Sequence, residues 1–274
     1  MRKTFWFTAC VVALTALASG CSHQDTAPAA ATKSTIPDSA VFSSASVDPS
    51  LSASAGQASL PGLTMEPTST YTGDVAPATT TNPCTYDASA GRVVCTPVVR
   101  EGLTYTRSYA YYDTAGKAQP APNAATRSMN TQIGVKGTRT TAKGDTVSID
   151  RSSNTTLSGL GKGVATHTIN GTEHGTTTSS YTIYWGKVSA TETFDVVTKD
   201  VVVQAEAKSR WPLSGSTSRT STTVATLEKT LTRTATSSET VTYNGTSVVP
   251  VVIVRDGVTH NCTRDLSTGK NTCS

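Results

Sequence analysis

Four cysteines in the second part of the chain occur as two pairs with the same spacing. The segments CTYDASAGRVVC, from Cys84 to Cys95, and CTRDLSTGKNTC, from Cys262 to Cys273, each carry an Asp soon after the first Cys and a Gly shortly before the second. The Asp, Ser and Gly of each segment could form half of a calcium site, and its two cysteines could be redox-active or form a disulfide. Calcium loops need several converging carboxylates, and redox motifs of the Cys-X-X-Cys type are much shorter, so neither of the first two chemistries fits. We therefore expect structural disulfides.

The first segment has the register of a cross-linked β-hairpin. When Cys84 is placed opposite Cys95, Asp87 faces Arg92 across a loop in which Gly91 can adopt positive φ. The opposite charges at the base of the loop would add to its stability. In the chain-entropy model a cross-link of this length contributes about 2–3 kcal/mol.

The second segment has the same register, with Asp265 opposite Lys270 when Cys262 faces Cys273. Four cysteines allow three pairings, and an exported protein would meet an oxidising environment. The shared register favours the two local pairings over the alternatives.

Three tyrosines and an arginine alternate along one predicted strand that starts at Leu103. Tyr105, Arg107, Tyr109 and Tyr111 share a face of this strand because side chains alternate with period two. Tyrosines in a row can stack on sugar rings or bases, which makes these residues a candidate ligand face. Core packing is the alternative, since the chain has few other aromatic residues.

Two histidines flank a predicted turn. His167 and His174 lie on either side of Asn170–Gly171, a strong hairpin signal, and Glu173 is adjacent. A hairpin there would place one histidine on each arm, where the two could bind a metal weakly. We expect two strand residues facing solvent instead, because no third ligand is evident. No metal or other cofactor is predicted.

No arrangement of residues predicts catalysis. The chain lacks a G-x-S-x-G motif, and no pair of carboxylates can be assigned to a cleft from the sequence. We therefore expect a protein that is not an enzyme.

The pattern beyond Asn82 predicts an all-β fold. Period-two alternation recurs, most clearly over Val201–Trp211, and Asn170–Gly171, Asn244–Gly245 and Asp256–Gly257 are turn signals between such runs. We expect an antiparallel up-and-down meander of about eight or more strands. Its strongly twisted sheet would be open or would close into a half-barrel or barrel.

The first residues have the composition of a secretory signal peptide, with Arg2 and Lys3 before a short apolar stretch. The segment Leu17-Ala18-Ser19-Gly20-Cys21 that follows resembles the lipobox of bacterial lipoproteins. The resemblance implies cleavage after residue 20, acyl chains on Cys21 and anchoring in a membrane. For a Gram-negative cell, the same resemblance implies that Ser22 in place of Asp directs the protein to the outer membrane rather than the inner one.

Residues 21–81 are rich in Ala, Ser, Thr and Pro, and this composition predicts a disordered tether before a folded domain at 82–274. The net charge of the whole chain is +4 and the tether is acidic, so the domain is mildly basic. Such a domain suits anionic envelope glycans or lipids as partners, although an ordinary solvated surface is the simpler interpretation. No nucleic acid partner is expected.

Three functions fit these observations. The first is a lipid-anchored protein of the bacterial envelope whose all-β domain is a non-enzymatic binding or structural module. The second is a lipid or glycolipid carrier with a cavity in a curved sheet. The third is a hydrolase of the envelope or an inhibitor of one.

Overall fold

The computed structural model describes residues 84–141, 144–184, 186–205, 211–228 and 230–274. The expected signal peptide at 1–20, Cys21 and the tether at 21–81 lie outside these residues. The described residues form thirteen β-strands and no helix. The strands are β1 (Cys84–Asp87), β2 (Arg92–Arg100), β3 (Leu103–Tyr112), β4 (Ala118–Gln119), β5 (Ser128–Thr140), β6 (Thr146–Ser158), β7 (Thr166–Ile183), β8 (Gly186–Gln204), β9 (Ser214–Leu227), β10 (Leu231–Thr242), β11 (Val248–Arg255), β12 (Val258–Asp265) and β13 (Lys270–Cys273).

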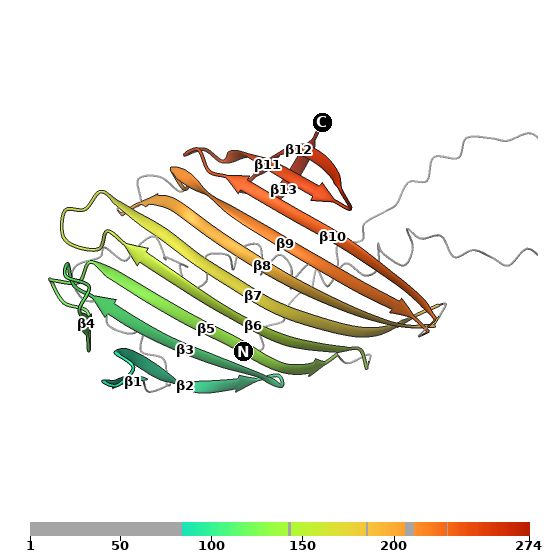
Figure 1. The fold of residues 1–274 in the computed structure, drawn as a ribbon, viewed down its shortest axis with the longest axis horizontal. Helices are drawn as coiled ribbons and strands as arrows, with labels where there is room; N and C mark the ends of the chain where they lie inside the picture. The colour runs from blue at the N-terminus through green and yellow to red at the C-terminus, as the bar shows by residue number, and fades with distance from the viewer. Residues whose placement is uncertain (1–83, 142–143, 185, 206–210, 229) are drawn as a thin grey trace, which may run out of the picture. The chain divides into compact units, whose positions relative to one another are not determined.

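The strands form one antiparallel sheet in which neighbours along the chain are neighbours in space (Figure 1). The order runs from β1 to β13, with the short β4 beside β3 and off the main path. Within the described residues β1 pairs only with β2, and β13 pairs only with β12. The all-β up-and-down meander is confirmed, and of the expected forms the sheet is the open one rather than a barrel.

The predicted disulfide hairpins form the two edges of this open sheet. Cys84 is bonded to Cys95 and Cys262 to Cys273, with Cα atoms 3.9 and 4.0 Å apart. The residue pairs of both hairpins are those expected from the shared register. Because an edge strand presents unpaired backbone groups to other chains, the short cross-linked arms limit the edge that is exposed.

The aspartates of these hairpins do not form the expected charge pairs. The Asp87 carboxylate accepts hydrogen bonds from the Ser89 backbone N–H at 2.9 Å and from the Ser89 hydroxyl at 2.6 Å. Arg92 points away and donates to Asn130 at 2.8 Å. Asp265 bonds to Ser267 in the same way, at 2.7 and 2.5 Å. In both hairpins the Asp carboxylate bonds to the serine two residues further along its own loop instead of to the basic residue across the hairpin. An Asp at the start of a turn can form such local hydrogen bonds.

Two of the three predicted turns are present. Asp256 and Gly257 join β11 to β12 with φ of 47° and 85°, as a two-residue hairpin turn requires. Asn244 and Gly245 lie between β10 and β11, and the φ of Gly245 is 82°.

The prediction of a turn at Asn170–Gly171 was wrong. Both residues lie inside β7, at an irregularity in its pairing with β8. A Cβ at Gly171 would lie 2.9 Å from the backbone oxygen of Asn154 on β6, so glycine here permits close approach of a neighbouring strand. The predicted strand over Val201–Trp211 is also shorter than expected: β8 ends at Gln204, and residues 206–210 lie outside the described part of the chain.

The two faces of the sheet differ in composition. One face, here called the aromatic face, carries Tyr109 on β3, Phe194 on β8 and Val251 on β11. The other, here called the hydroxyl face, carries Asp195 on β8 and Thr220 on β9. Two clusters of buried apolar residues lie among the described residues, and the partly buried Tyr243 packs against both. One consists of Val241, Val249, Val251, Ile253 and Cys262, and the other of Leu157, Leu160, Ile169 and Val201.

Candidate functional site

The predicted ligand face lies on β3 as expected, with its four residues on the aromatic face. Tyr111 is buried, with 6% of its surface exposed, and therefore belongs to the core. Tyr109 is half-buried, Arg107 is exposed, and 38% of Tyr105 is exposed. Three of the four residues can thus meet a ligand.

The structure adds Tyr86 to this group. Tyr86 on β1 pairs with Val93 on β2, which pairs with Tyr109 on β3, so the three side chains form one row across the sheet. Tyr86 is 37% exposed. Two strand spacings place it about 10 Å from Tyr109. The register between β2 and β3 shifts between Cys95 and Val98, and a shift of this kind cannot be predicted from the spacing of residues.

We call Tyr86, Tyr105, Arg107 and Tyr109 the tyrosine–arginine strip. Arg107 makes no hydrogen bond or ion pair with another residue that the structure describes. Its guanidinium can therefore donate to a hydroxyl, carboxylate or phosphate. Tyrosine rings offer flat apolar faces and a hydroxyl group, a combination that suits sugar rings.

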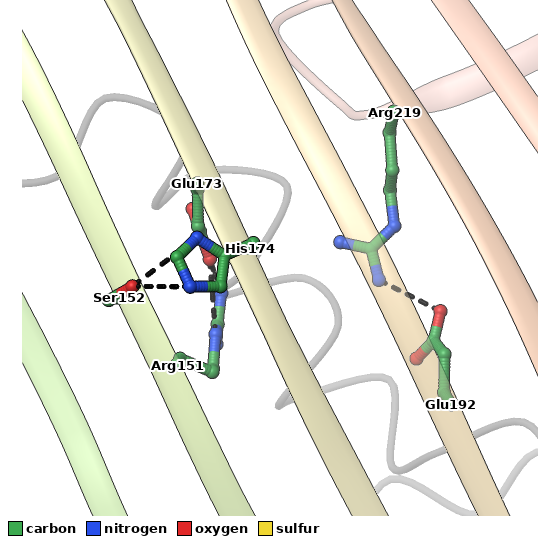
Figure 2. A network of polar contacts seen from close by, with 6 residues as sticks. All are labelled: Arg151, Ser152, Glu173, His174, Glu192 and Arg219. Carbon is green, nitrogen blue, oxygen red and sulfur yellow. Dashed lines mark hydrogen bonds and ion pairs between the residues drawn. The ribbon is translucent and has the colours of Figure 1, made fainter.

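The middle of the aromatic face holds two ion pairs on either side of Phe194. Arg151 on β6 bonds to Glu173 on β7, and Arg219 on β9 donates to Glu192 on β8 at 2.8 Å (Figure 2). Both guanidinium groups lie over the Phe194 ring, with their Cζ atoms 5.2 and 4.2 Å from its centroid. The ring of Phe194 is buried, so these contacts order the centre of the sheet.

A glycine makes room for this group. Gly175 on β7 lies directly opposite both Arg151 and Phe194. A Cβ at Gly175 would lie 2.7 Å from Cγ of Arg151 and 2.9 Å from Cζ of Phe194. Only glycine allows the two larger side chains to meet over this strand.

A third ion pair lies nearer the other edge of the aromatic face. Arg264 on β12 donates two hydrogen bonds to Glu239 on β10, at 2.8 and 2.7 Å, and a third to Asn271 at 2.8 Å. Its guanidinium therefore has fixed partners on two strands, unlike that of Arg107. We therefore interpret this ion pair as a contact that holds strands of the sheet together, and not as a ligand-binding group.

A serine, a histidine and an aspartate lie in one row on the hydroxyl face. Ser152 on β6 pairs with His174 on β7, which pairs with Asp195 on β8. The Ser152 hydroxyl lies 3.0 Å from Nε2 and 3.4 Å from Nδ1 of His174, as Figure 2 shows. The three strands are paired on both sides, so their backbone N–H groups are engaged in the sheet and cannot stabilise an oxyanion.

The two histidines do not form a metal site. Because β7 continues through Asn170–Gly171, His167 and His174 lie on opposite faces of one strand. His167 is buried and its Nδ1 lies 3.0 Å from the backbone oxygen of Gly159, so the expectation of a solvent-facing residue holds only for His174. Across the part of the chain that the structure describes, no group of three or more His, Cys, Asp or Glu side chains could hold a metal ion.

These features define an open antiparallel sheet protein with an exposed tyrosine–arginine strip beside a disulfide hairpin. Comparisons with protein-family models, with curated proteins and with solved structures found no match. The described residues contain no helix long and apolar enough to cross a membrane.

Proposed function

We propose that this chain is a lipid-anchored protein of the bacterial cell envelope whose sheet is a non-enzymatic binding module for envelope glycans. The observation that carries the proposal is the tyrosine–arginine strip, in which Tyr86, Tyr105 and Tyr109 are accessible around an exposed Arg107. The lipobox resemblance at Leu17–Cys21 supports the location.

The position of the strip supports a binding role. Its side chains lie on paired strands, which hold them more rigidly than a loop would. The disulfide between Cys84 and Cys95 holds β1, and with it Tyr86, against β2. Rings that are fixed before binding lose little conformational freedom when a ligand arrives.

The carrier alternative has less support. An apolar lipid chain needs a continuous apolar lining, whereas three ion pairs cross the aromatic face between β6 and β12. Covering these charges with hydrocarbon would remove their remaining contact with water, which is costly.

The hydrolase alternative has one observation in its favour, the row of Ser152, His174 and Asp195. Such a row could activate Ser152 as a nucleophile. A fluorophosphonate probe tests this directly: we expect no labelling of Ser152 in the native protein. Labelling that is lost in a His174→Ala variant would establish a reactive serine and overturn the proposal that the module is not an enzyme.

The binding proposal is tested by calorimetric titration of the full-length protein, in detergent, with lipopolysaccharide-derived polysaccharide. We expect Tyr105→Ala and Tyr109→Ala each to weaken binding by roughly three- to tenfold, because each removes one stacking surface. Tyr184→Ala is the matched control, since Tyr184 is 94% exposed at the turn between β7 and β8, away from the strip.

The salt dependence of binding distinguishes a specific site from general electrostatic attraction to a basic domain. Binding by stacking and hydrogen bonds persists at about 0.5 M salt, where the interactions between exposed charges are largely screened. Loss of all binding at that salt concentration, or equal weakening by Tyr184→Ala, would contradict the proposal.

A further inference from the structure

The hydroxyl face contains a shallow depression of about 290 Å³ across β8, β9, β10 and β11. This volume is close to the lower end of the range for ligand pockets, about 300–1,000 Å³. It lies on the opposite face from the tyrosine–arginine strip and is a separate feature. Its polar lining comes from the side chains of Thr193, Asp195, Thr220, Thr222, Thr236 and Ser238.

The depression lies between two cross-strand rows of short side chains. In one row Thr193 pairs with Thr222, and Thr222 pairs with Thr236. In the other row Asp195 pairs with Thr220, and Thr220 pairs with Ser238. Rows two residues apart along a strand are separated by about 7 Å, which leaves a trough between them.

The hydroxyl groups in the trough are not bonded to one another. Thr222 and Thr236 are direct cross-strand partners, as are Thr220 and Ser238, yet none of these hydroxyls has a hydrogen-bond partner among the described residues.

On either side of the trough, hydroxyl pairs of β9 and β10 are hydrogen-bonded to each other. Ser218 and Thr240 lie 3.1 Å apart on one side, and Thr226 and Thr232 lie 3.1 Å apart on the other. The trough therefore concentrates donors and acceptors that the sheet itself does not use.

The trough also carries a negative charge. The Asp195 carboxylate makes no ion pair or hydrogen bond with any residue that the structure describes. The groups that face it on adjacent strands are His174 on β7 and Thr220 on β9. Lys199 lies on the same face of β8, four residues further on, too far for a direct contact.

We propose that this trough binds a sugar unit that carries a protonated amine. Asp195 pairs with the ammonium group, and the hydroxyls of the trough exchange hydrogen bonds with those of the sugar. Val254 at the rim and the threonine methyl groups contact the apolar C–H face of the ring. The site goes beyond the glycan binding proposed for the tyrosine–arginine strip and does not depend on it.

The test uses a β-1,4-linked tetramer of glucosamine and its fully N-acetylated counterpart, titrated into the full-length protein in detergent. We expect the wild-type protein to prefer the free amine. Asp195→Asn should weaken binding of the amine tetramer by about tenfold or more, because it removes a charge-assisted hydrogen bond. Its affinity for the acetylated tetramer should not change.

The matched control is Asp150→Asn. Asp150 lies on the same face but outside the trough, and its carboxylate accepts a hydrogen bond from Lys136 at 2.7 Å. We expect this variant to bind like the wild type. Equal weakening by both variants would show attraction to general negative charge and overturn the site, as would a wild-type protein without preference for the amine.

The hydroxyl groups are tested by Thr222→Val, which keeps the shape of the side chain and removes its hydroxyl. We expect both tetramers to bind more weakly, by roughly two- to tenfold, because a ligand hydrogen bond is lost. Unchanged affinity for both tetramers would contradict the role of the trough.

Discussion

Removal of the first disulfide should open the edge of the sheet while the rest stays folded. The strand β1 has only four residue pairs with β2, and Thr85, Tyr86 and Asp87 are all exposed. Little buried surface therefore holds this arm in place apart from the bond between Cys84 and Cys95. In a Cys84→Ser, Cys95→Ser variant we expect β1 to separate locally from β2.

The size of the effect follows from the loop that the bond closes. The cysteines are separated by 11 positions in the sequence. The chain-entropy relation gives about 2.8 kcal/mol for a loop of this length at room temperature. This free energy corresponds to about a 100-fold increase in the equilibrium for opening the hairpin.

Amide hydrogen exchange measures this opening. The cysteine Cα atoms are 3.9 Å apart, which identifies a non-hydrogen-bonded pair and makes Thr85 and Val94 the next hydrogen-bonded pair. Their amides should exchange about 100-fold faster in the variant. The matching variant, Cys262→Ser with Cys273→Ser, should leave these amides unchanged. Equal protection of Thr85 and Val94 with and without their own disulfide would refute the reasoning.

Three further predictions concern single residues. Hydrogen bonds from the Ser89 hydroxyl, and then from the Ala90 and Ser89 backbone N–H groups, hold the pKa of Asp87 below its ordinary value of 3.8. The contribution of these hydrogen bonds to the stability of the fold is therefore complete above the ordinary value and is lost as the pH falls through the lowered pKa of Asp87. Ser89→Ala should raise the titration midpoint of Asp87, measured by NMR of its carboxyl carbon, and an unchanged midpoint would contradict the assignment. Gly171→Ala should destabilise the protein by about 1–3 kcal/mol, since its Cβ would meet the neighbouring strand; an unchanged urea midpoint would contradict this. Cys21→Ser should release the protein from membranes in a fractionation experiment, and unchanged partitioning would argue against acylation.

Local features of the fold could be predicted because they depend on neighbouring residues. The hairpin of Cys84 and Cys95 and the Asp256–Gly257 turn each need only a short segment, and both are present. At Asn170–Gly171 the same kind of signal failed. There β6 and β8 pair with β7 on both sides across these residues, and the pairing with two long neighbours outweighs the local turn preference.

The candidate site could be predicted only where one strand supplies it. Tyr105, Arg107 and Tyr109 share β3, so period two was enough to place them on one face. Tyr86 joins them through a register that depends on an irregularity in β2. The trough around Asp195 combines four strands, and its hydroxyls could not be told from the many other threonines without the register.

The most direct test of the proposed function is the NMR signal of the tyrosine ring protons in the full-length protein. Addition of lipopolysaccharide-derived polysaccharide at about 0.5 M salt should shift the ring protons of Tyr86, Tyr105 and Tyr109, because sugar rings stack on them. The ring protons of the buried Tyr111 should move little. Saturable binding that leaves the signals of Tyr86, Tyr105 and Tyr109 unchanged would contradict the proposal that the tyrosine–arginine strip is the glycan-binding site.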